Sequence, residues 1–141
     1  TALDVTVQAQ ILGLLKELVH ETGAALILIT HDLGVVARYA DRVCVMYGGK
    51  IVETADASDL YERPMHPYTR GLMASIPRLD QPAGVRLVPI IGQPPNLAQL
   101  PPGCAFNPRC SEAAERCRRD TPNLMKAGDG HSHACWMVPH G

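Results

Sequence analysis

Hydrophobic positions in the first 22 residues recur at steps of three and four, as they do on one face of an amphipathic helix. The positions are Val7, Ile11, Leu14, Leu15, Leu18 and Val19. This spacing predicts a helix from Val5 to Thr22, and Gly23 stands where a helix end favours a residue that tolerates positive φ. Residues 24–29 are all apolar, and so short a run predicts a strand covered on both faces, as in a parallel sheet.

A further helix and two strands are predicted after Thr30-His31-Asp32. Residues 33–40 fit a short helix, and residues 42–47 are rich in β-branched side chains, which favour a strand. Gly48 and Gly49 supply the φ values of a tight hairpin, so residues 50–54 should return as its antiparallel partner. Asp56 is placed to cap another short helix over residues 58–61. This order of elements is typical of an α/β fold.

Prolines and cysteines distinguish the chain after Glu62. Residues 79–102 are rich in proline, so regular helix is not expected there. Four cysteines follow, separated by 5, 6 and 17 residues: Cys104, Cys110, Cys117 and Cys135. The fifth, Cys44, lies in an apolar strand and is predicted to be an inert core residue. We expect an irregular C-terminal appendage that depends on its cysteines for order.

Composition narrows the class of protein and the chemistry open to those cysteines. The chain has 141 residues, 46% hydrophobic side chains and a net charge of −1, which fits one ordinary domain and no nucleic-acid partner. No stretch approaches the ~18 apolar residues of a membrane span, and the first residues do not resemble a signal peptide. A cytosolic location is therefore expected, where thiols stay reduced and metal or cluster ligation competes with disulfide formation.

One short segment resembles a phosphate-binding motif but lacks two of the residues that the motif requires. Gly48-Gly49-Lys50 is similar to the end of a phosphate-binding loop, but Cys44 replaces the first glycine and Ile51 replaces the required hydroxyl residue. The sequence contains no such loop elsewhere.

Three segments together resemble the ATP-binding subunits of ABC transporters: residues 1–4, 29–32 and 45–53. Residues 63–72, which contain His66-Pro67-Tyr68, resemble the oligopeptide, dipeptide and nickel importer subfamily. The similar stretches cover nearly the whole chain. The resemblance implies an α/β fold, with the C-terminal part of a P-loop nucleotide-binding domain at 1–62. It implies the subfamily's cysteine-rich C-terminal region at 63–141.

The resemblance also implies roles for two residues. His31 matches the histidine that contacts the γ-phosphate of ATP, a role suited to an imidazole that can donate a hydrogen bond. Asp4 matches the aspartate of a loop that couples two nucleotide sites across a dimer. The implied cofactors are ATP and Mg²⁺, and the implied reaction is in-line phosphoryl transfer to water. Without the resemblance, Asp4 could simply be an N-cap and His31 a solvent-facing residue.

Other parts of the family pattern are missing. The phosphate-binding loop, glutamine loop, signature loop, metal-binding aspartate and general-base glutamate lie upstream of the position matching Thr1. We therefore expect the chain alone neither to bind nor to hydrolyse ATP. The implied partners of the parent protein are a second ATP-binding subunit, transmembrane permease subunits and, through them, an extracytoplasmic peptide-binding protein. Its implied location is the inner face of the cell membrane.

The cysteine-containing segment after residue 102 is called the tail, and its first part, residues 103–110, is called the head of the tail. The head of the tail is also similar to this subfamily, some members of which hold a [4Fe-4S] cluster. The expected ligands are Cys104, Cys110, Cys117 and Cys135, with Arg109, Arg116, Arg118 and Arg119 offsetting the negative charge. Zinc is the alternative, including a mixed site with His131 and His133, although no Cys-x-x-Cys pair is present. A second hypothesis for function is accordingly a stand-alone metal or iron–sulfur module with a structural or redox role.

Overall fold

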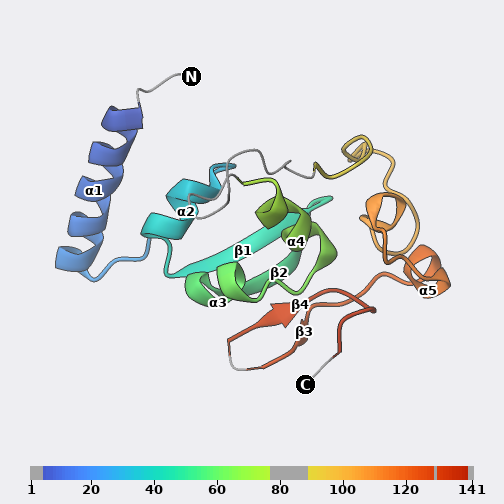
Figure 1. Cartoon of the computed structure of the whole chain (residues 1–141). Coiled ribbons are helices and arrows are strands. Elements are labelled where there is room, and N and C mark those ends of the chain that lie inside the picture. Colours follow the sequence, from blue (N-terminus) through green and yellow to red (C-terminus); the bar gives the residue numbers. More distant parts are fainter. Residues whose placement is uncertain (1–4, 77–88, 129, 140–141) are drawn as a thin grey trace, which may run out of the picture. The chain divides into compact units, whose positions relative to one another are not determined.

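The computed structural model describes residues 5–76, 89–128 and 130–139, which form two compact units, 1–40 and 41–141. The first unit contains α1 (Val5–Thr22) and α2 (Leu33–Tyr39), as Figure 1 shows. Tyr39 of α2 donates a hydrogen bond from its hydroxyl to the carbonyl of Ala9 in α1, at 3.2 Å. Gly23 ends α1 with a φ of 65°, so the predicted helix and its glycine end are both confirmed.

The predicted strand at residues 24–29 is wrong. These residues form no regular secondary structure, and the side chains of Ile27 and Ile29 are 88% and 94% exposed. A strand needs a hydrogen-bonded neighbour, and the described part of the first unit contains only helices besides this segment. Residues 24–29 therefore have side chains that favour a strand, but the described part of this unit offers no neighbouring strand with which they could pair.

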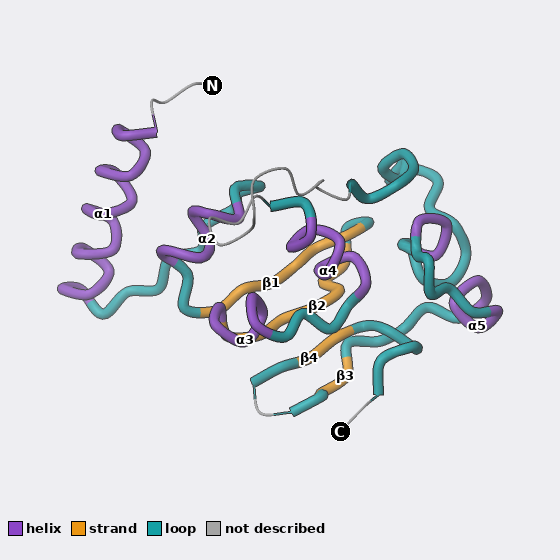
Figure 2. The backbone as a smooth tube through the Cα atoms, in the orientation of Figure 1, coloured by secondary structure: helices purple, strands orange, loops and turns teal. Residues whose placement is uncertain are grey.

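The second unit is built on a β-hairpin, as Figure 2 shows. β1 (Arg42–Tyr47) and β2 (Lys50–Asp56) pair antiparallel, and Gly48 and Gly49 turn the chain with φ values of 58° and 76°. The predicted hairpin is confirmed. α3 (Ala57–Glu62) follows with Asp56 at the N-cap position, but the Asp56 side chain makes no capping hydrogen bond. α4 (Pro67–Ala74) is the next helix.

The tail is more regular than predicted, because part of it joins the hairpin. It contains a 3-10 turn (Asn107–Arg109), α5 (Glu115–Arg119), β3 (Met125–Lys126) and β4 (Ser132–His133). The strand order is β1-β2-β4-β3, and all pairs are antiparallel. β4 satisfies backbone groups that would otherwise stay open along the edge of β2. The fold is thus a mixture of helices and an antiparallel sheet.

The core of the second unit lies between the hairpin, α3, α4 and the tail. Its buried apolar side chains include Val43, Val45, Tyr47, Val52, Ala55, Leu60 and Phe106. Three aromatic rings meet there: Tyr47 lies 4.6 Å from Tyr68 and 5.1 Å from Phe106, and Tyr68 lies 5.4 Å from Phe106. The cluster joins β1, α4 and the head of the tail. The assignment of residues 1–62 and 63–141 to two regions, which differs from the two compact units, stays a prediction.

Candidate functional site

His31 lies in the turn that leads into α2, and its side chain is exposed. The turn is held on both sides of the histidine. Thr30 Oγ1 accepts a hydrogen bond from the Asp32 amide at 3.0 Å, and Asp32 Oδ1 accepts from Gly34 and Val35 at 2.9 and 3.2 Å. Asp32 is therefore a side-chain N-cap of α2. His31 is presented to solvent on a constrained turn, and Asp4 lies outside the described residues.

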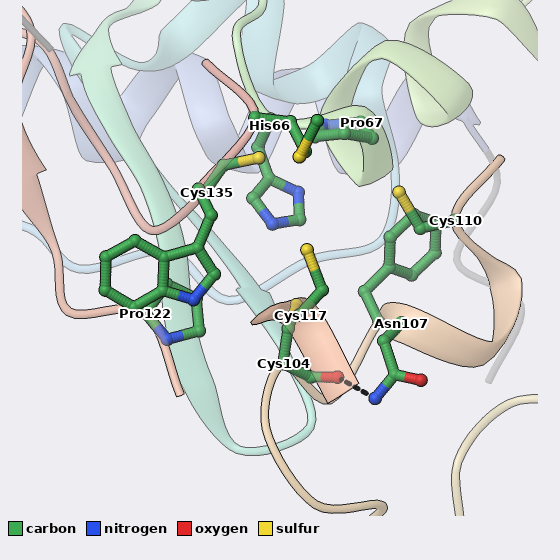
Figure 3. Close-up of a pocket in the computed structure, with 11 residues that line it drawn as sticks. His66, Pro67, Cys104, Asn107, Cys110, Cys117, Pro122 and Cys135 are labelled. Carbon is green, nitrogen blue, oxygen red and sulfur yellow. Dashed lines mark hydrogen bonds between the residues drawn. The ribbon is translucent and has the colours of Figure 1, made fainter. Parts of the chain in front are cut away.

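The four tail cysteines line one pocket of the second unit, a cavity of about 10 Å³ (Figure 3). Cys104 and Cys110 flank the 3-10 turn, Cys117 is in α5, and Cys135 follows β4. The other lining residues are His66, Pro67, Phe106, Asn107, Pro122, Trp136 and Met137. The lining contains no carboxylate, so thiols are its main candidate ligands.

Backbone contacts bring the head of the tail against α5. The Cys104 amide donates to the Cys117 carbonyl at 2.8 Å. Asn107 Nδ2 donates to the carbonyls of Cys104 and Pro102 at 2.8 and 2.9 Å. Gly103 has a φ of 76° and makes this approach possible, because a Cβ there would clash with the Cys117 carbonyl oxygen. Local backbone geometry thus brings Cys104 and Cys117 together without a covalent link.

The thiols of the four tail cysteines are partly or fully buried. Burial raises the pKa of Cys104, Cys110 and Cys135, and neighbouring cysteines raise it further in each case. The mutual effect of the thiols agrees with their place around one pocket.

Cys44 differs from its prediction: it is exposed on β1, because Val43, Val45 and Tyr47 occupy the buried face of the alternating strand.

The described residues contain no group of three or more His, Cys, Asp or Glu side chains placed to hold a single metal ion. A zinc ion would need its thiolates within about 2.3 Å of one point. The mixed zinc site is not formed, because His131 Nε2 is bound to Glu53 Oε1 at 2.7 Å and neither His131 nor His133 lines the pocket. The four predicted arginines do not line it either.

Two of those arginines have other partners nearby. The Arg116 guanidinium lies 3.6 Å from the centre of the Trp136 ring, and Trp136 lines the pocket. Trp136 also donates from Nε1 to the Asp120 carbonyl at 3.0 Å. Arg109 donates to the carbonyls of residues 90 and 91 at 3.1 and 3.0 Å. Arg116 therefore contacts the lining of the pocket through Trp136, whereas Arg109 links the 3-10 turn to residues 90 and 91.

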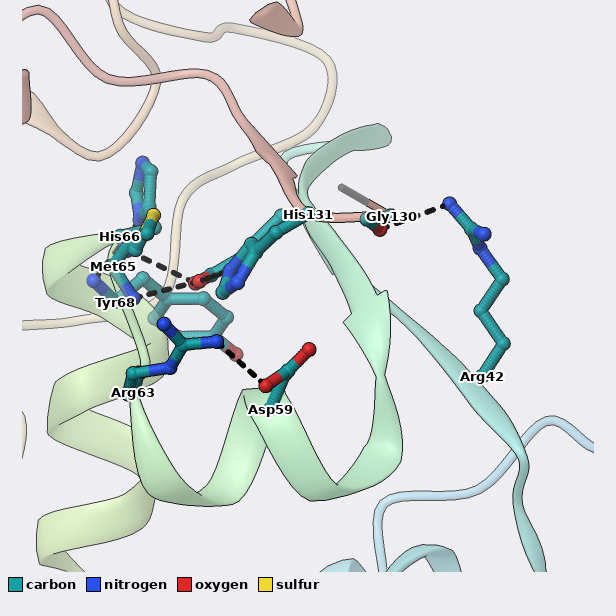
Figure 4. Close-up of polar contacts among 9 residues, drawn as sticks. Arg42, Asp59, Arg63, Met65, His66, Tyr68, Gly130 and His131 are labelled. Atoms are coloured by element: carbon teal, nitrogen blue, oxygen red, sulfur yellow. Dashed lines mark hydrogen bonds and ion pairs between the residues drawn. The ribbon is translucent and has the colours of Figure 1, made fainter. Parts of the chain in front are cut away.

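Sequence reasoning missed the role of Glu53, whose side chain is fully buried. Its carboxylate accepts hydrogen bonds from the Met65 amide at 2.6 Å, the His66 amide at 2.9 Å and His131 Nε2 at 2.7 Å. Figure 4 shows Met65, His66 and His131 gathered at this point. Glu53 thereby ties β2 to the segment before α4 and to the residue before β4. The available signal was a charged residue in the middle of a predicted strand, directly after the apolar pair Ile51 and Val52.

In the sequence His66 stands out only as part of the segment that resembles the importer subfamily. In the structure its side chain is buried at the cysteine pocket. Its side chain is 1% exposed, and its Nδ1 accepts from the Tyr68 amide at 3.0 Å, capping α4. Burial is the largest cause that lowers the pKa of His66, to about 4. The imidazole is therefore neutral at pH 7.

Comparison with known proteins shows what the chain is similar to. The family described as "Oligopeptide/dipeptide transporter, C-terminal region" matches residues 52–117. The oligopeptide transport ATP-binding protein OppD of Mycobacterium tuberculosis is 55% identical over 135 residues, 96% of this chain and 22% of the relative. The dipeptide transport ATP-binding protein DppD of Bacillus subtilis is 52% identical over 137 residues, 97% of this chain and 41% of the relative. OppD of Salmonella typhimurium is 51% identical over 136 residues, 96% of this chain and 40% of the relative.

Over at least 96% of its length the chain is therefore similar to the ATP-binding proteins of oligopeptide and dipeptide transporters, and residues 52–117 match the family's C-terminal region. It spans between about one fifth and two fifths of the length of these relatives. None of the helices among the described residues has the length and apolar character needed to cross a membrane.

Proposed function

We propose that this chain is part of the ATP-binding subunit of an importer that takes up oligopeptides or dipeptides. The observation that carries the proposal is identity of 51–55% over at least 96% of the chain to proteins named as peptide transport ATP-binding proteins. The cofactors are ATP and Mg²⁺. The partners are a second ATP-binding subunit and transmembrane permease subunits, with an extracytoplasmic peptide-binding protein delivering substrate to the permease. The protein acts at the inner face of the cell membrane.

In this proposal His31 donates a hydrogen bond to the γ-phosphate and helps to orient the attacking water, while Asp4 couples two nucleotide sites. The exposed position of His31 on a turn held by Thr30 and Asp32 supports the first role. A fixed donor costs little reorganisation when charge develops on the phosphoryl oxygens. The residues that hold the other phosphates and the metal would come from outside residues 1–141.

Replacing His31 with alanine in the full-length protein, assembled with its permease, should lower ATP hydrolysis about 100-fold or more, because one positioned donor is lost. ATP-driven uptake of a labelled dipeptide or oligopeptide should fall with it. The matched control is His20→Ala, which removes an exposed histidine from α1 of the same unit and should leave both rates unchanged. Undiminished hydrolysis in H31A would refute the role of His31. Lack of ATP-dependent peptide uptake by the unchanged protein would refute the function.

We propose in addition that Cys104, Cys110, Cys117 and Cys135 hold a [4Fe-4S] cluster. The supporting observation is that all four thiols line one pocket without a carboxylate. A bound cluster would supply four iron–thiolate bonds that link three segments of the tail to one another, and a centre able to exchange one electron. Its role here is structural, since the pocket adjoins the core of the second unit.

A further inference from the structure

His66 contacts three different parts of the second unit from one buried position. It lines the cysteine pocket together with Pro67, as Figure 3 shows. Its amide donates to the Glu53 carboxylate at 2.9 Å, which fixes the backbone of this residue against β2. His66 is not one of the expected metal ligands, so its burial at the pocket needs a separate explanation.

The two ring nitrogens of His66 have different tasks. Nδ1 accepts a hydrogen bond from the Tyr68 amide, so it carries no proton in this arrangement. The proton of the neutral ring is then on Nε2. The backbone of Ala134 also acts on the ring as a hydrogen-bond acceptor that raises the pKa of His66, and Nε2 is the ring nitrogen left to face it. Ala134 directly precedes Cys135 in the chain.

The ring of His66 also packs against the head of the tail. Its centre lies 5.9 Å from that of Phe106, which is 3% exposed. Phe106 stands between Cys104 and Cys110 in the chain, and its ring is locked further by Tyr47 and Tyr68. One side chain therefore contacts the segments that carry three of the four thiols. The fourth, Cys117, is joined to Cys104 by a backbone hydrogen bond of 2.8 Å.

We propose that His66 is the positioning residue of the cysteine pocket, which holds Cys135 and the Cys104–Cys110 segment in place against β2 before any metal is bound. Two polar contacts, with Glu53 and with the backbone of Ala134, and one ring contact, with Phe106, support this role. These three partners lie in segments that are distant from one another in the sequence. The inference rests on the proposed cluster only for the identity of the ligand. The placement of the thiols is a property of the metal-free chain.

Two substitutions separate the tasks of the ring nitrogens. The amide group of asparagine overlaps the position of Nδ1, so His66→Asn should retain the cap of α4 and lose the donor to Ala134. The longer glutamine reaches the position of Nε2, so His66→Gln should retain the donor and lose the cap. Both variants remove a buried ring and leave a similar void, so each serves as the control for the stability of the other.

The readout is alkylation of each cysteine by iodoacetamide in the metal-free full chain, followed by mass spectrometry. Iodoacetamide should alkylate Cys135 about tenfold faster in H66N than in the unchanged chain. In H66Q the rate of alkylation of Cys135 should stay within about twofold of that in the unchanged chain. Hydrogen exchange at the Tyr68 amide should show the opposite order, faster in H66Q than in H66N. The exchange result confirms that both variants are folded and differ as designed.

Equal alkylation of Cys135 in H66N and H66Q would overturn the positioning role, because the Ala134 contact would then not matter. A variant that fails to fold leaves the other to be compared with the unchanged chain, with the same expected rates. A chain that shows these alkylation rates but binds no iron would sink the proposed cluster and leave the role of His66 intact. The two proposals can therefore fail separately.

Discussion

Replacing Glu53 with glutamine should lower the free energy of unfolding of the full chain by about 3 kcal/mol, because a buried carboxylate with three donors loses one of its acceptor oxygens. The donors are the amides of Met65 and His66 and the Nε2 of His131, at 2.6, 2.9 and 2.7 Å. Glutamine keeps the shape of the side chain but places an NH₂ group against one of these donors. Water cannot compensate, since Glu53 is fully buried.

The matched control is Glu112→Gln, which also removes a carboxylate with short contacts. Arg70 Nη2 lies 2.6 and 2.7 Å from the two oxygens of Glu112, but both side chains are 43% exposed. Exposed ion pairs contribute about 0–1 kcal/mol, so E112Q should unfold almost as the unchanged chain does. Urea unfolding, followed by the fluorescence of Trp136, the single tryptophan, measures both variants. Equal midpoints for the two would show that Glu53 does not anchor the tail.

Replacing Gly103 with alanine should cost about 2–5 kcal/mol and open the cysteine pocket. Gly103 has a φ of 76°, and a Cβ would clash with the Cys117 carbonyl oxygen and lie 2.8 Å from the Arg118 carbonyl carbon. All the obstructing atoms belong to the backbone, so relief requires α5 to move away from the head of the tail. The Cys104 amide would then lose its bond to Cys117.

Gly49→Ala isolates the part of this effect that comes from backbone conformation. Gly49 has the same φ of 76°, and a Cβ there would meet no atom within 4 Å. G49A should therefore cost about 1 kcal/mol, the strain of a positive φ alone. Urea unfolding of the two variants gives the difference, and alkylation of Cys117 reports whether the pocket has opened. A G103A variant as stable as G49A would mean that α5 does not approach Gly103 closely.

Local sequence patterns predicted the elements that local interactions form. The helix at residues 5–22 follows from the spacing of its apolar side chains, and the hairpin from Gly48 and Gly49. Residues 24–29 show the limit of this reasoning, since an apolar run can adopt a strand only where another strand pairs with it. β3 and β4 have two residues each, too few for any periodic signal, and their pairing with the hairpin is set by distant contacts.

The four cysteines of the candidate site could be singled out from the sequence, but the residues that surround and support them could not. The spacing and family resemblance of the tail singled out Cys104, Cys110, Cys117 and Cys135, which the structure places around one pocket. His131 was considered as a zinc ligand because it lies near Cys135 in the sequence, but it binds Glu53 from 78 residues away. Proximity in sequence does not indicate which way a buried side chain faces. The task of His66 likewise depends on Phe106 and Ala134, which only the tertiary structure brings to it.

Iron and acid-labile sulfide, measured in the full chain purified without oxygen, test the cysteine pocket most directly. The proposal predicts about four of each per chain, with visible absorbance that is lost in Cys117→Ser. Cys44→Ser is the matched control and should retain the full iron content, because Cys44 is exposed on β1 and does not line the pocket. Zinc without iron, no bound metal, or an iron content that C117S leaves unchanged would contradict a cluster held by the four tail cysteines.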